Sequence, residues 1–145
     1  MNQDVNTDTD RCPECGAATV DGLRCWKQLG MLLSWEAEDR ELAGEHFLTV
    51  ASYNLQHPAQ FVDEVLAGLQ ASFIEHLDHG LPVEQIRRRT ARATAGKTRV
   101  LKDESERHFV LRRWPMTIAD VYLPDQPGGA AGRVRTWAAT IRRAL

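Results

Sequence analysis

The chain has 145 residues, of which 43% are hydrophobic and 26% charged, a composition typical of one globular domain rather than of a disordered or membrane-spanning protein. No apolar run approaches the roughly 20 residues that cross a bilayer, so we expect no membrane partner. The net charge of −2 hides an asymmetry, because residues 1–80 carry 14 acidic and 4 basic side chains, whereas residues 81–145 carry 6 and 14. Such halves can attract each other within one chain or between chains, or the basic half can bind a polyanion.

Residues 1–11 hold three Asp and no hydrophobic stretch, which predicts a disordered acidic tail and argues against a secretory signal. We therefore expect a cytoplasmic protein whose thiols stay reduced. Its three cysteines are an odd number, which does not make a disulfide framework. We expect residues 12–145 to form a single helical domain.

Apolar residues at helical spacing follow a turn-rich stretch at residues 12–24. Five segments show this spacing: 25–36, 39–57, 58–79, 82–94 and 133–145. Asp39 is the expected N-cap of the second segment, and Gly80 is the expected stop of the third. Pro58 suits the first turn of the third segment, because proline lacks only an amide that would be unpaired there.

Residues 95–116 show less regular spacing. We expect Phe109, Leu111 and Trp114 to pack as an extended or looped segment near residues 109–113. Thr117 can cap a short helix, and the Pro/Gly-rich residues 124–132 predict a loop. Short connections between amphipathic helices favour antiparallel neighbours. The predicted fold is therefore all-α: a small helical bundle with an N-terminal zinc knuckle at 12–25 and a short extended segment.

The cysteine pattern predicts a zinc site. Cys12 and Cys15 form a CxxC followed by glycine, a spacing that lets both sulfur atoms turn onto one ion. Cys25 follows after nine intervening residues, at the expected start of a helix, where the helix dipole stabilises a thiolate. A redox CxxC normally follows a strand, and none is expected before Cys12. Because structural zinc takes four ligands, the three cysteines need a fourth.

Two histidines are candidates for the fourth ligand, and they cannot both serve. His46 and His57 lie on one helical face but are separated by about 16 Å along the helix axis. His57 is favoured because it lies at a helix end beside Pro58, where a knuckle can dock. His46 lies inside the segment, where a lone histidine is more often a hydrogen-bonded residue of the core, and it is kept as the alternative ligand.

A dense basic run covers residues 87–102 and is a candidate nucleic-acid site through counterion release. No aromatic residue is interleaved with it, so base stacking is not expected there. The simpler interpretation is a solvated helix face docked on the acidic half.

The chain resembles an uncharacterised bacterial family catalogued as domain of unknown function 5946. Three stretches carry the likeness: CPECG with CW at 25–26, HFLTVASYNLQHP at 46–58, and FVLRRWPMTIADV at 109–121 followed by a helix with Trp137. Members of the family often carry Asp where this chain has Ala51. The resemblance implies helical structure and a metal role for the cysteines and histidines, but no activity, substrate or partner.

These observations leave three functions open. The favoured one is a zinc-stabilised helical protein that acts as an interaction module, through self-association or a protein partner. The second is a metal-dependent enzyme using His46 or His57, with Tyr53 and a carboxylate such as Glu45 around an open metal position. The third is nucleic-acid binding through the basic run. No catalytic sequence pattern is present, so an enzyme is the less favoured interpretation.

Overall fold

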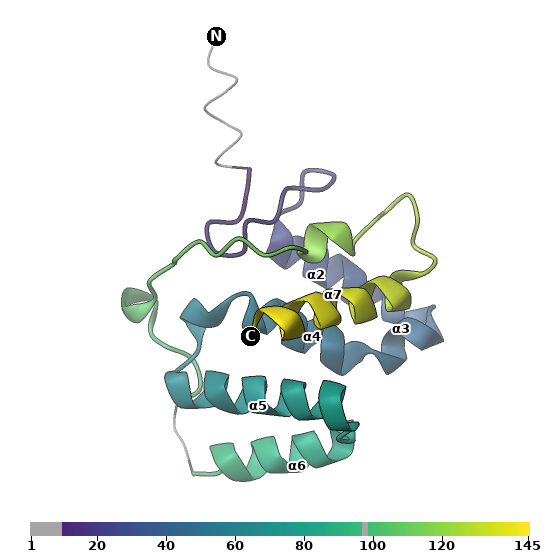
Figure 1. Ribbon diagram of the computed structural model, residues 1–145. Coiled ribbons are helices and arrows are strands. Elements are labelled where there is room, and N and C mark those ends of the chain that lie inside the picture. The colour runs from purple at the N-terminus through teal and green to yellow at the C-terminus, as the bar shows by residue number, and fades with distance from the viewer. Residues whose placement is uncertain (1–9, 97–98) are drawn as a thin grey trace.

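The computed structural model describes residues 10–96 and 99–145, and within these residues the fold is all-α, as predicted (Figure 1). The α-helices are α2 (Cys25–Ser34), α3 (Arg40–Gly44), α4 (His46–Leu55), α5 (Asp63–His79), α6 (Val83–Thr94) and α7 (Ala130–Ala144). The described residues form no strand, and their only β-pairing is three isolated bridges. None of the helices in these parts of the chain is long and apolar enough to cross a membrane.

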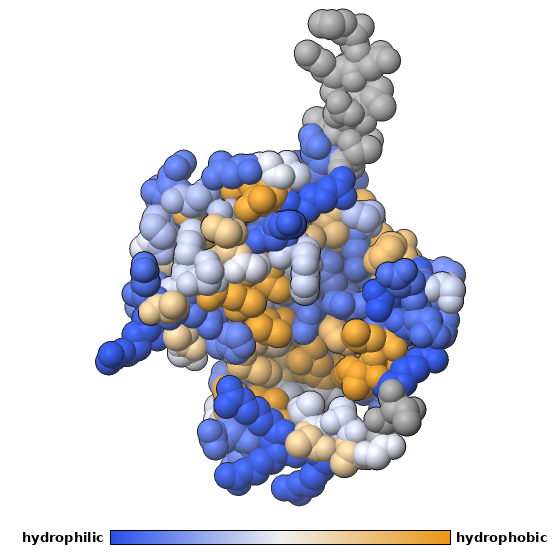
Figure 2. Space-filling model, turned by 180° about the vertical axis from the view of Figure 1, so that it is seen from behind, coloured by the Kyte–Doolittle hydropathy of each residue, from blue (hydrophilic) through white to orange (hydrophobic). Residues whose placement is uncertain are grey.

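The last helix, α7, is the centre of the packing. It lies against α3, α4 and α5, and α6 packs on the outer side of α5. Trp137, Val134, Ala138 and Ile141 are fully buried, so one face of α7 supplies much of the core. Figure 2 shows the rear of the molecule, where apolar side chains gather in a hollow between the body and the arm that α6 forms.

The predicted segment 39–57 is broken into two helices. Asp39 caps the first as expected, accepting a hydrogen bond from the Leu42 amide. The chain leaves helical geometry at Glu45, where φ is −102° and ψ is 18°. Gly44, a weak helix former, precedes this break. The bend lets Leu42 on α3 and Leu48 on α4 both reach the core.

The helix expected from residue 58 begins later. Pro58 opens a separate short 3-10 turn, η3 (Pro58–Gln60), and α5 starts at Asp63. Between them the backbone pairs with a distant segment, since the Val62 amide donates to the Val100 carbonyl at 3.0 Å. Gly80 ends α5 in left-handed geometry, with φ 69°, as predicted.

Residues 107–114 have no regular secondary structure. The segment is therefore a loop, one of the two forms expected; Phe109 and Leu111 are 59% and 49% exposed, whereas Trp114 is partly buried. Thr117 does cap a short helical turn, η5 (Ile118–Asp120), through a capping box with Asp120.

The acidic and basic halves of the chain pair with each other inside one molecule. Four basic side chains of the second half contact carboxylates of the first: Arg89–Glu75, Lys102–Asp63, Arg135–Glu41 and Glu45, and Arg142–Asp78. These pairs lie at the surface, where each contributes little to stability. They account for part of the charge asymmetry without a second chain.

Gln56 links the end of α4 to two distant elements. Its amide nitrogen donates to the Met116 carbonyl at 2.8 Å, and its amide oxygen accepts from the Trp137 indole at 3.3 Å. The side chain is almost fully buried. These bonds fix the backbone next to His57, the favoured fourth ligand.

Candidate metal centre

The CxxC motif forms a tight turn whose amides point at sulfur. The backbone N–H groups of Glu14 and Cys15 both lie 3.5 Å from the Cys12 sulfur, and the Ala17 N–H lies 3.4 Å from the Cys15 sulfur. Gly16 closes the turn with φ +77°, a geometry that favours glycine. Such N–H···S contacts stabilise the thiolate form that a metal requires.

The knuckle extends slightly beyond its predicted limits. Residues 1–9 of the expected tail lie outside the described residues. Asp10 and Arg11, predicted to belong to that tail, pair instead with the knuckle. The Thr19 amide donates to the Asp10 carbonyl at 3.1 Å, and Arg11 forms an isolated antiparallel β-bridge with Ala18.

Four side chains converge beside this turn. Cys25 is the first residue of α2, and His57 lies between α4 and η3. With Cys12 and Cys15 they form a group whose ligand atoms all lie within 4.8 Å of one another. The His57 Nε2 atom is 3.4 Å from the Cys25 sulfur and 3.6 Å from the Cys12 sulfur.

These separations fit a tetrahedral metal. Zinc–sulfur and zinc–nitrogen bonds of about 2.3 and 2.0 Å at a tetrahedral angle put nitrogen and sulfur about 3.5 Å apart. The three sulfur atoms and one imidazole could therefore hold a metal ion.

Tyr53 covers the histidine from one side. Its ring stacks on the His57 ring with centroids 3.9 Å apart, and its hydroxyl lies 3.6 Å from the Cys25 sulfur. Tyr53 and His57 are one helical turn apart, so the contact follows from local sequence. Both side chains are buried, and the cluster is largely shielded from solvent.

The pKa values of three side chains in the cluster are strongly shifted. Hydrogen bonds with Cys15 and Cys25 lower the pKa of the Cys12 thiol, and the hydrogen bond with Cys12 raises the pKa of Cys15. Burial lowers the pKa of His57, but hydrogen bonds with Cys12 and Cys25 outweigh burial and raise that pKa to about 10. A divalent cation must displace the protons on His57 and Cys15, so its binding weakens in acid.

Glu14, inside the CxxC motif, anchors the knuckle to the rest of the fold. Its carboxylate accepts a hydrogen bond from the Ala59 amide at 2.8 Å, and the residue is 5% exposed. Burial raises the pKa of this carboxyl. This role was not predicted, because no local pattern in the sequence indicates a partner 45 residues away.

A second anchor, also missed, is Gln28 on α2. Its amide nitrogen donates to the carbonyls of Ala18 and Leu23, both at 2.9 Å. Val20 and Leu23 form a bridge within the same loop. Gln28 therefore holds the loop that leads from the CxxC turn to Cys25.

His46, the alternative ligand, lies apart from the sulfur atoms. It is not a member of the four-residue group, and its Nδ1 atom lies 2.9 Å from the Glu36 carboxylate on the surface. Glu45, named for an enzyme site, instead accepts a hydrogen bond from Arg135. Of the residues considered for such a site, the structure brings only Tyr53 and His57 to the cysteines.

The basic run is partly neutralised. Arg89, Arg99 and Lys102 each contact a carboxylate, on Glu75, Glu106 and Asp63 respectively. Arg87, Arg88 and Arg92 are exposed on α6, and Lys97 lies outside the described residues. Nucleic-acid binding by this run stays a prediction.

The fold and the site together define a small helical protein with a Cys₃His cluster that can hold a metal ion. The chain belongs to the family of unknown function DUF5946, whose sequence model matches residues 10–145. That match confirms the resemblance seen in the sequence. No curated protein and no solved structure shows significant similarity to the chain.

Proposed function

We propose that Cys12, Cys15, Cys25 and His57 bind one zinc ion, and that the protein is a zinc-stabilised helical interaction module. Three thiolates and one imidazole make a donor set that suits zinc. The separations of 3.4 and 3.6 Å between the imidazole nitrogen and two of the sulfur atoms support tetrahedral binding. The bound ion would tie the CxxC turn to the start of α2 and the end of α4.

One observation supports a structural rather than a catalytic role for the ion: the protein supplies all four ligands of the site. Four protein ligands fill a tetrahedral ion, whereas a catalytic zinc keeps one position for water. Tyr53 stacks over His57, which is itself 7% exposed. The enclosure favours a structural ion over the metal-dependent enzyme.

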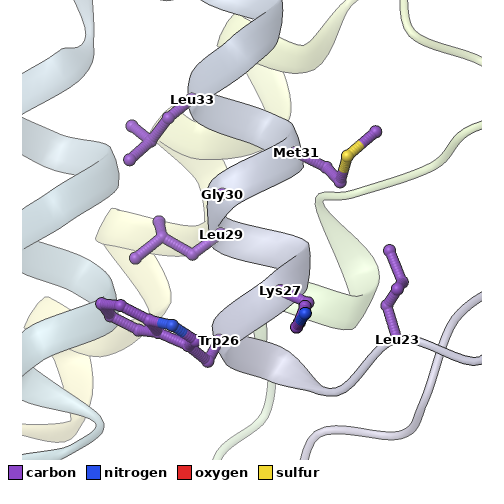
Figure 3. A pocket seen from close by; sticks show the side chains of 7 residues that line it. All are labelled: Leu23, Trp26, Lys27, Leu29, Gly30, Met31 and Leu33. Carbon is purple, nitrogen blue, oxygen red and sulfur yellow. The ribbon is translucent and has the colours of Figure 1, made fainter.

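Exposed apolar side chains support the interaction role. On α2, Trp26 and Met31 are 66% and 41% exposed, and they border an apolar pocket of about 440 Å³ (Figure 3). In this view Trp26, Leu29 and Leu33 project from one side of the helix, and Met31 projects from the other. Large exposed apolar side chains of this kind are enriched at protein interfaces.

Metal analysis of the purified chain tests the proposal. We expect one zinc per chain, and after exchange to Co²⁺ we expect the absorption bands of a tetrahedral cobalt–thiolate site. Because the site is closed, added imidazole should leave the Co²⁺ spectrum unchanged. Metal-free protein would contradict zinc binding, and a spectrum that changes with imidazole would favour the enzyme alternative.

A further inference from the structure

One exposed segment carries an unused backbone edge. Residues 107–113, which we call the 107–113 edge, run along the outside of the molecule toward the knuckle (Figure 1). Phe109, Val110 and Leu111 are 59%, 75% and 49% exposed. Among the described residues, the backbone groups from 108 to 111 make no hydrogen bond with other backbone. Such an edge is a template for pairing with another strand.

The metal-binding turn holds this edge from one side. The Arg112 amide donates to the Glu14 carbonyl at 3.1 Å. A Cβ placed on Gly16 would lie 3.4 Å from the Leu111 side chain, so the segment rests directly on the turn. In an extended chain successive amides point to opposite sides. Since the Arg112 amide points inward, those of Phe109 and Leu111 point outward.

A cavity opens next to the edge. It has a volume of about 230 Å³, and Val110, Trp114, Leu55 and Leu66 are among the residues that line it. The indole nitrogen of Trp114 is buried and has no acceptor among the described residues. A side chain of an incoming peptide can occupy this space.

The basic side chains of the 107–113 edge favour one kind of partner. Arg107, Arg112 and Arg113 lie on it, and no carboxylate of the described residues forms a salt bridge with any of them. Two copies paired antiparallel about Val110 would set Arg107 against Arg113 twice, which is unfavourable. The charge therefore favours an acidic partner over a second copy.

Single-stranded nucleic acid fits the edge less well. Bases stack on aromatic faces, but Val110 and Leu111 are aliphatic. The Arg112 guanidinium lies 3.9 Å from the centre of the Trp114 ring and covers that ring's face. Phe109 is the one exposed large aromatic side chain on the edge.

We propose that the 107–113 edge binds an extended segment of a partner protein, apolar at its centre and acidic at its ends, which pairs with the edge as a β-strand. The inference rests on the proposed interaction function and names the surface and the partner's chemistry. Because the edge rests on the knuckle, binding requires that the knuckle is folded.

The test begins with selection of a random linear peptide library on the immobilised zinc-loaded chain. We expect enriched peptides that alternate apolar residues between acidic ends. For one such peptide, fluorescein-labelled, Leu111→Pro should weaken binding about tenfold or more, because it removes an outward amide. Leu111→Ala keeps the outward backbone amide and is the matched control, so it should weaken binding much less than Leu111→Pro. Melting temperatures show whether each variant remains folded.

Hydrogen exchange by NMR gives a second readout without substitution. The amides of Phe109 and Leu111 should become protected in the complex, and that of Val110 should not. No enrichment, equal effects of Leu111→Ala and Leu111→Pro, protection only at Val110, displacement by oligothymidylate, or a dimer formed through the edge would each overturn the inference.

The outcomes also separate this inference from the proposed function. If peptides bind but Trp26→Ala removes binding and Leu111→Pro does not, the interaction module stands and the edge is wrong. If the chain binds no zinc yet peptides protect Phe109 and Leu111, the edge stands and the zinc proposal fails.

Discussion

The Nδ1 atom of His57 lies 2.6 Å from the carbonyl oxygen of Tyr53, one helical turn earlier. A ring nitrogen that donates to a carbonyl leaves the other nitrogen with its lone pair free. In the neutral ring this is Nε2, which faces the sulfur atoms of Cys12 and Cys25. Helix α4 therefore fixes the position of the imidazole, and it selects the tautomer that the ring adopts once a cation displaces the Nε2 proton.

The two histidines give a matched pair of variants. His57→Ala should lose zinc, and its melting temperature should fall toward that of the metal-free protein, because three thiolates leave the tetrahedral ion incomplete. His46→Ala should keep its zinc, since that ring contacts the carboxylate of Glu36 and is not a member of the four-residue group. Zinc content and thermal melts measure both. Loss of zinc in His46→Ala alone would refute the assignment.

Cys15→Ser should abolish zinc binding and destabilise the chain severely. A structural zinc contributes on the order of ten kcal/mol of apparent folding free energy. Ser52→Ala is the control, because the Ser52 hydroxyl is buried without a partner among the described residues and its removal should be nearly neutral. Circular dichroism melts with zinc analysis distinguish the two. Equal melting temperatures for Cys15→Ser and the parent would contradict a structural role.

Glu14→Ala should destabilise the fold by about 1–3 kcal/mol, because it leaves the buried Ala59 amide without its acceptor. Glu14→Gln keeps an amide oxygen at that place and should cost less. Chemical denaturation of the zinc-loaded protein measures both changes. If the two variants are equally stable, the hydrogen bond is not what holds the knuckle in place.

Two glycines should respond to alanine in opposite directions. Gly16→Ala should destabilise by about 1–2 kcal/mol, because φ is +77° there and the new methyl meets Leu111 at 3.4 Å. Gly30→Ala should stabilise by roughly 0.5–1 kcal/mol, because Gly30 lies inside α2 and a Cβ there meets nothing within 4 Å. Denaturation curves provide the free energies, and changes of the same sign would refute the turn geometry.

The ion pair between Asp78 and Arg142 should produce a measurable pH dependence. A hydrogen bond from Arg142 holds the pKa of Asp78 below its ordinary value of 3.8. Because the folded pKa is the lower one, the pair stabilises the fold above pH 3.8, and this stabilisation disappears as the pH falls through the folded pKa. The stability difference between the parent and Asp78→Asn should therefore shrink in acid. Added salt should shrink it too, since the pair is exposed.

The Cys₃His cluster could be predicted from the sequence, because each of its four residues lies in a recognisable local pattern. Two cysteines three positions apart must lie on one turn, Cys25 begins a helix, and His57 stands beside a proline that ends one. The length of a helix excluded both histidines from one site, and the place of His57 at a helix end beside Pro58 favoured it over His46. The four side chains then come together once the start of α2 meets the end of α4, where Cys25 contacts Tyr53 and His57.

The hydrogen bonds that anchor this cluster could not be predicted from the sequence, because tertiary packing determines their partners. Glu14 reaches Ala59, and Gln56 reaches Met116 and Trp137, across long stretches of sequence. The separate η3 turn after Pro58 likewise depends on a distant partner, since the backbone there pairs with residues near Val100. Hydrophobic periodicity gives the helices and their faces but not these cross-links.

Gln56 and His57 are neighbours in sequence, but they serve opposite regions of the molecule. His57 faces the sulfur atoms, while Gln56 holds the indole nitrogen of Trp137 in the core. A single peptide unit therefore joins the Cys₃His cluster to the centre of the protein. Removal of a bound ion should change the surroundings of Trp137, although this side chain does not contact the cluster. The intrinsic tryptophan fluorescence of the chain should therefore vary with its metal content.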